Sequence, residues 1–378
     1  MEQTERTELL RRLIDWKSDA GILTVYVHLD PGDRGGGWSI ALREQLHELE
    51  EQTAPHAERR AFEAAAGEVF ERFPEKGALP EGRGHAGFIE LGGKEPKAVW
   101  RSMQIGPRRT EVTRSARPYV RQLVELFAEG PHVGAVLVSA DRVRLLDWSL
   151  GAIRELEDWE ITVFSPDWRE SKADRAIPGT GTRSSASGHD QFSQRLDANR
   201  RRFLHEVASL VARERAKRLW QHLFVFGVED LARGFAAGVG NGVGSVHTAQ
   251  HDLVSSKEPD VAERVRAEVL EVTTSQGLEL VGEVEEAIGA SPGAALGAQE
   301  TLQALGEGRV RHLVFNAEHN FESVPPADQV YDDGRGDLPV GERLVQLAVA
   351  TDAGVTPVHG EPASRLAAHE GVAGLLRY

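Results

Sequence analysis

Apolar and polar positions alternate along the chain with two different periods, and the period separates expected helices from expected strands. Apolar residues recur every three to four positions near the start, which is typical of an amphipathic helix, and a β-branched and aromatic stretch follows, which is typical of a buried strand. The expected elements are helices over 1–18, 40–52 and 57–73, a strand over 22–29, and a β-hairpin of 87–91 with 98–103. These elements predict an N-terminal α/β domain over residues 1–130.

The central part of the chain has a different order of elements. Short apolar stretches predict strands at 133–139, 143–148, 160–164, 222–227 and 245–251, with a long helix after about 192 and a second helix over 228–236. Three successive strands indicate an antiparallel meander. The whole order predicts a domain of ribonuclease-H type topology over residues 131–257.

The last part, residues 258–378, alternates helix and strand at short intervals. Expected helices cover 259–271, 277–287, 298–305, 341–352 and 364–369, and expected strands cover 311–315, 355–358 and 372–378. This pattern predicts an α-β-α sandwich whose final strand fixes the C-terminus. The fold class is therefore mixed α/β (α+β) with three domains.

The most informative stretch is Gly188-His189-Asp190-Gln191. Small and turn-forming residues over 179–187 predict a mobile loop before it, and a helical pattern rich in arginine follows it. A glutamine amide can hold a water molecule or line an oxyanion site. Gly188 and Gln191 are thus the first candidates for catalysis. His189 is a competing candidate as a general base, although a plain loop histidine is the commoner case.

Five arginines around this stretch could hold phosphate groups. They are Arg183, Arg195, Arg200, Arg201 and Arg202. An arginine-rich helix start is most often only a solvated face, and this alternative stays open. The net charge of −15 excludes indiscriminate nucleic-acid binding, so any contact with RNA has to be local or relayed by a protein partner.

Composition and the remaining motifs exclude several other functions. There are no cysteines, so disulfides and thiolate zinc sites are absent, and the polar start and lack of an apolar stretch of about 20 residues predict a cytoplasmic protein. The glycine-rich segments 32–37 and 238–244 lack the Gly-Lys-Ser/Thr of a phosphate loop. His247 and His251 have metal-like spacing but lie in an expected strand. We expect no metal, no cofactor, no DNA and no membrane partner.

The glutamine loop, the basic helix and the final segment together resemble the archaeo-eukaryotic peptide chain release factor and Pelota superfamily, most closely its bacterial branch related to the peptidyl-tRNA hydrolases of ribosome quality control. The similarity covers about residues 133–378, and the closing string GVAGLLRY is its most specific short part. The family loop carries Gly-Gly-Gln, with an arginine four residues later. Gln191 and Arg195 keep that spacing, Gly188 fits the Gly-x-x-Gln variant, and His189 and Asp190 depart from Gly-Gly.

The resemblance implies binding to the ribosome, with ribosomal RNA and peptidyl-tRNA as partners and a loop that helps water attack the ester between peptide and tRNA. It also implies an L7Ae-like last domain that docks a translational GTPase or the ribosome. No Asn-Ile-Lys-Ser string occurs before residue 118, so stop-codon decoding is not expected. Two functions remain open: a peptidyl-tRNA hydrolase on stalled or idle ribosomes, and a non-catalytic ribosome-binding, hibernation or rescue factor.

Overall fold

A computed structural model describes residues 3–29, 36–53, 56–74, 79–92, 97–161, 185–290, 293–321 and 335–377. The described chain forms two compact units, one made of residues 1–131 with 269–378 and the other of residues 132–268. Helices and several sheets alternate throughout, which confirms the mixed α/β class. The division into three domains stays a prediction. No described helix has the length and apolar character needed to span a membrane.

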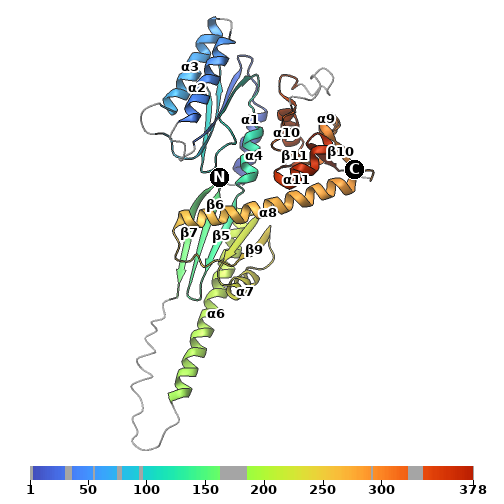
Figure 1. Cartoon of the computed structure of the whole chain (residues 1–378). Helices are drawn as coiled ribbons and strands as arrows, with labels where there is room; N and C mark the ends of the chain where they lie inside the picture. Colours follow the sequence, from blue (N-terminus) through green and yellow to red (C-terminus); the bar gives the residue numbers. More distant parts are fainter. Residues whose placement is uncertain are drawn as a thin grey trace, which may run out of the picture. The chain divides into compact units, whose positions relative to one another are not determined.

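The N-terminal part of the first unit is a four-stranded sheet in the order β3-β2-β1-β4 (Figure 1). Its elements are α1 (Gln3–Ile14), β1 (Ile22–His28), α2 (Gly37–Glu51), α3 (His56–Arg72), β2 (Gly84–Glu90), β3 (Ala98–Met103), β4 (Glu111–Ser115) and α4 (Arg121–Glu129). The expected helices, strand and hairpin are confirmed. Strand β1 is buried almost throughout because it lies in the middle of the sheet, against a core that it shares with α2 and α3.

The C-terminal part of the first unit has a second four-stranded sheet in the order β10-β13-β11-β12, in which β11 and β12 are parallel and the other pairs antiparallel. Its elements are α8 (Glu258–Ala287), β10 (Ala294–Leu296), α9 (Gly297–Gly306), β11 (Val310–Asn316), α10 (Val340–Ala350), β12 (Gly354–Val358), α11 (Gly360–Arg365), η3 (Leu366–His369) and β13 (Val372–Leu376). The final strand is buried as predicted. Helix α8 is continuous where two pieces were expected.

The second unit is a five-stranded sheet in the order β7-β6-β5-β8-β9. Its elements are β5 (Val133–Val138), β6 (Arg142–Ser149), β7 (Ala152–Glu160), α6 (Ser185–Arg218), β8 (His222–Phe226), α7 (Glu229–Val239) and β9 (Ser245–Ala249), together with the start of α8. The antiparallel meander and the edge strand β9 are confirmed. The third strand was predicted too late, at 160–164, because charged residues occupy most of β7.

Candidate nucleic-acid interface

Helix α6 is anchored to the sheet of the second unit by its C-terminal half only. Val207, Ala208 and Val211 belong to the core that α6 shares with β5, β6, β8 and α7. These positions recur at three-to-four-residue spacing, so one side of the helix packs on the sheet. Among the α6 side chains that the structure describes, Val207 is the first buried one. The preceding turns therefore extend from the anchored part into solvent (Figure 1).

The predicted site residues lie at the start of this extended part. At about 1.5 Å per residue, position 191 is about 24 Å along the helix axis from Val207. Positions 188, 191 and 195 share one side of the helix with Arg202, because about 3.6 residues make a turn. The same geometry places the buried positions 207, 208, 211 and 215 on the opposite side. The helix thus aligns these four positions on the side facing away from the sheet.

The prediction of a loop before Gly188 is wrong for the last residues of that stretch. Helix α6 begins at Ser185, so Gly188, His189 and Gln191 lie in its first two turns. The predicted mobility of residues 179–184, and Arg183 with them, lies outside the described residues. The side chains at 188, 189, 191 and 195 lie outside the described side chains as well. The structure therefore fixes the backbone context of the candidate residues, and their roles stay predictions.

Basic charge concentrates on α6 although the chain as a whole is acidic. The helix carries eight arginines and lysines against four acidic residues, in a chain with a net charge of −15. Arg201 and Arg202 are exposed, and among the described residues neither has an acidic side chain within ion-pairing distance. Arg200 is half-buried and lies 3.9 Å from Asp197. The helix therefore presents uncompensated cations that suit phosphate groups.

Metal binding finds no support in the described part of the chain, where no three His, Cys, Asp or Glu side chains gather. His247 lies against His222, at 3.1 Å between Nδ1 of His222 and Nε2 of His247, and its ring stacks on Phe224. Burial, and to a smaller extent the neighbouring His247, lowers the pKa of His222 to about 4. The pair is therefore a neutral, packed contact between β8 and β9.

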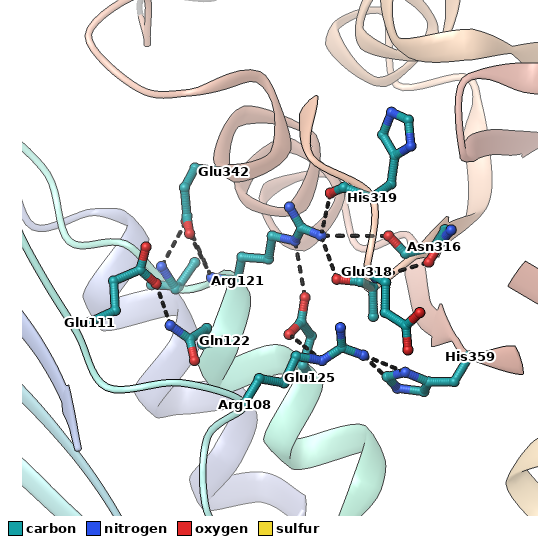
Figure 2. Close-up of polar contacts among 12 residues, drawn as sticks. Arg108, Glu111, Arg121, Gln122, Glu125, Asn316, Glu318, His319, Glu342 and His359 are labelled. Carbon is teal, nitrogen blue, oxygen red and sulfur yellow. Dashed lines mark hydrogen bonds and ion pairs between the residues drawn. The ribbon is translucent and has the colours of Figure 1, made fainter. Parts of the chain in front are cut away.

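The structure also reveals a polar centre in the first unit that sequence patterns do not indicate (Figure 2). The buried Glu342 carboxylate on α10 accepts the backbone N–H groups of Val120 at 2.7 Å and Arg121 at 3.1 Å. These N–H groups lie at the N-terminus of α4, where a helix has no internal acceptors for them. Glu342 thus caps α4 from a distant part of the chain.

The same centre contains a reciprocal contact. The Arg121 guanidinium donates to the carbonyl of Ala317 at 2.9 Å and of His319 at 3.2 Å, and its Nε donates to Glu125 at 3.0 Å (Figure 2). The central guanidinium carbon of Arg121, Cζ, also lies 5.0 Å from the centroid of the Phe321 ring. Glu342 therefore accepts from N–H groups of α4 that have no acceptor in the helix, and Arg121 on α4 donates to carbonyls that follow β11. These reciprocal hydrogen bonds hold α4 to the end of β11 and to α10.

We predict that Glu342 makes the stability of this unit fall as pH rises. Burial raises the pKa of Glu342 to about 8, although the two backbone N–H groups and Arg121 act to lower it. Between about pH 4.5 and 8 the folded protein therefore holds a proton that the unfolded chain releases, so the free energy of unfolding decreases across this window. Glu342→Gln removes this titration and keeps an acceptor oxygen. Thermal unfolding at pH 5 and pH 8 should show a larger loss of Tm in the wild type than in the variant, and equal losses would contradict the assignment.

Comparison with known proteins gives the class of the central unit. Residues 131–267 match the model of the family described as Bacterial archaeo-eukaryotic release factor family 5, a range that coincides closely with the second unit. The central unit is therefore similar to bacterial archaeo-eukaryotic release factors, in agreement with the predicted resemblance. Within that class, the matched family is family 5. No curated protein matches the sequence.

Solved structures related to this class align over most of the chain at low identity. The archaeal translation termination factor aRF1 is 17% identical, with 100% of this chain and 99% of that chain covered and a TM-score of 0.27. A ribosome-bound archaeal Pelota is 11% identical, with 98% and 94% covered and a TM-score of 0.43. Dom34 of S. cerevisiae, which interacts with Hbs1, is 8% identical, with 78% and 80% covered and a TM-score of 0.41. The family match to the central unit carries the classification.

Proposed function

We propose that this protein binds ribosomes and hydrolyses the ester of peptidyl-tRNA on stalled or idle ribosomes. The observation that carries the proposal is a release factor-like central unit whose basic helix aligns Gly188, Gln191 and Arg195 on its solvent side. Arg202 lies on the same side, so a phosphate backbone could run along the helix toward Gln191. A translational GTPase and the ribosome itself are the partners that the class suggests for the rest of the chain.

The chemistry requires little from the protein besides positioning. Water attacks the ester carbonyl carbon, the bond from that carbon to the ribose oxygen breaks, and a proton passes to the ribose oxygen, which gives free peptide and tRNA. The Gln191 amide would orient the water or stabilise the oxyanion, which is a transition-state effect. His189 is adjacent in the chain and is the competing candidate for accepting the proton of water.

A non-catalytic ribosome-binding factor is the second candidate, and the helical start of α6 favours it. A glutamine in a regular helix, beside His189 and Asp190, departs from the Gly-Gly-Gln loop of the class. A binding or hibernation factor would need only the basic face of α6. The discriminating experiment is release of labelled peptide from purified stalled complexes by the wild-type protein, with co-sedimentation measured in parallel. Release together with binding supports the hydrolase, and binding alone supports the factor.

Gly188 offers a test of whether the helix must open. Alanine at an exposed helix position is favoured over glycine by about 1 kcal/mol, so Gly188→Ala stabilises the helical form of residues 185–191. If the active form is a loop, as the class suggests, this variant should slow peptide release by roughly fivefold while raising helicity. Single-turnover release and circular dichroism measure the two effects. An unchanged release rate would mean that the helix itself is the active conformation.

A further inference from the structure

A buried guanidinium lies beneath a glycine-rich surface loop of the second unit. The Arg215 side chain, on α6, is 2% exposed and donates to the carbonyls of Gly240 at 3.3 Å and Gly244 at 2.6 Å. Its Nε is buried without a hydrogen-bond partner. Among the described residues, no carboxylate lies within ion-pairing distance of Arg215. A buried charge without a counter-charge is costly, so this cation is unusual in a folded protein.

Burial lowers the pKa of Arg215, and no acidic neighbour raises it. The guanidinium nevertheless keeps its proton, since arginine is protonated at any physiological pH. The two neutral carbonyls accept hydrogen bonds from some of its N–H groups, but they do not neutralise its positive charge. The electrostatic field of Arg215 therefore reaches the thin loop above it, where a Cβ placed on Gly242 would lie 3.5 Å from Nη1 of the guanidinium.

The loop, residues 240–244, joins α7 to β9 and leaves several of its amides without an internal acceptor. The C=O and N–H of a trans peptide point in opposite directions, and the Gly240 carbonyl faces Arg215, so the N–H of Asn241 faces away from it. Among the described residues, the N–H groups of 241, 242 and 243 have no hydrogen-bond partner, and all three residues are exposed. Gly244 has φ 79°, and a Cβ there would lie 2.2 Å from the Gln221 carbonyl oxygen, so the turn requires glycine.

We propose that this loop binds a phosphate group of an RNA backbone, with the amides of 241–243 as donors and Arg215 as the charge beneath them. Exposed consecutive N–H groups without an internal acceptor can bind an anion, and a nearby cation adds to the attraction. The choice of RNA rests on the proposed function. The loop is open and has no Gly-Lys-Ser/Thr sequence, so it suits a phosphate that a large polyanion presents rather than an enclosed nucleotide.

A matched pair of variants at Gly242 tests the inference. Gly242 lies outside the positive-φ region and its added Cβ would make an ordinary contact, so the backbone accepts a side chain there. Gly242→Asp gives Arg215 an internal carboxylate, whereas Gly242→Asn has the same shape without the charge. We expect the aspartate variant to bind a labelled RNA hairpin on the order of tenfold more weakly than the asparagine variant at low salt. Its slope of log K against log salt should be shallower by about 0.7 to 0.9.

Asn241→Glu against Asn241→Gln repeats the comparison on the exposed side of the loop, independently of packing against Arg215. Fluorescence anisotropy of the full chain measures all four affinities. Equal affinities within both pairs would refute the inference, as would displacement of the hairpin by micromolar ADP or inorganic phosphate, which would indicate a small-anion site. Co-sedimentation of the wild type with ribosomes is measured separately. If the protein binds ribosomes but the RNA affinities within each pair of variants are equal, only the phosphate site in the loop is refuted. If the affinities differ within the pairs but the protein does not bind ribosomes, only the proposed function is refuted.

Discussion

Gln191→Ala is expected to abolish most peptide release while leaving ribosome binding nearly intact. Under the proposed function, contact with the ribosome would be spread over the basic helix and other surfaces, so one amide would contribute little to affinity. A group that orients water or stabilises an oxyanion acts mainly in the transition state, and losing it should slow release by on the order of 10²–10³-fold. The measurement is single-turnover release of labelled peptide from purified ribosomal complexes, with co-sedimentation to confirm equal binding.

His189→Ala is the matched control for this experiment, because it alters the same turn of α6 and keeps the amide of Gln191. A loss confined to Gln191→Ala assigns the role to the glutamine, and a comparable loss in His189→Ala indicates a general base instead. Wild-type protein that releases no peptide from stalled, vacant-A-site or split 50S complexes would exclude the hydrolase. The second candidate, a non-catalytic ribosome-binding factor, would then be the supported function.

Replacing Arg200, Arg201 and Arg202 together by glutamate should weaken ribosome binding strongly and flatten its dependence on salt. Each phosphate contact releases counterions and contributes about 0.7 to 0.9 to the slope of log K against log salt. Three lost contacts should therefore lower the slope by roughly 2 to 3. Co-sedimentation at several salt concentrations measures both the affinity and the slope.

The three arginines allow a control that separates charge from helix structure. Replacing all three by lysine keeps the charge and the helix propensity, so binding should stay within a few-fold of wild type. Because Arg202 shares the side of Gln191 and Arg200 does not, Arg202→Glu alone should weaken binding more than Arg200→Glu alone. Unchanged binding of the triple glutamate variant would mean that this part of α6 is only a solvated surface.

Sequence patterns located elements wherever burial produces a simple period. Strands β1 and β8 lie inside their sheets, so both faces are apolar and the stretch is continuous. Strand β7 was placed too late because it lies at a sheet edge and carries Glu157, Asp158 and Glu160 on its exposed positions. Helix α4, at nine residues, went unrecognised between two prolines, since a short amphipathic segment resembles a linker.

The sequence by itself indicated the similarity of the central unit to release factors, the basic helix and the Gly-x-x-Gln spacing, because these depend on residues close together in the chain. Tertiary structure decided the rest. Helix α6 continues back to Ser185, since one glycine costs about 1 kcal/mol and does not stop a helix that is already formed. Glu342 caps α4 across more than two hundred residues, and Arg215 reaches the Gly240–Gly244 loop only after α6 and α7 pack together. Contacts of this kind leave no local sequence pattern, because only the folded chain brings each buried polar side chain to its partner.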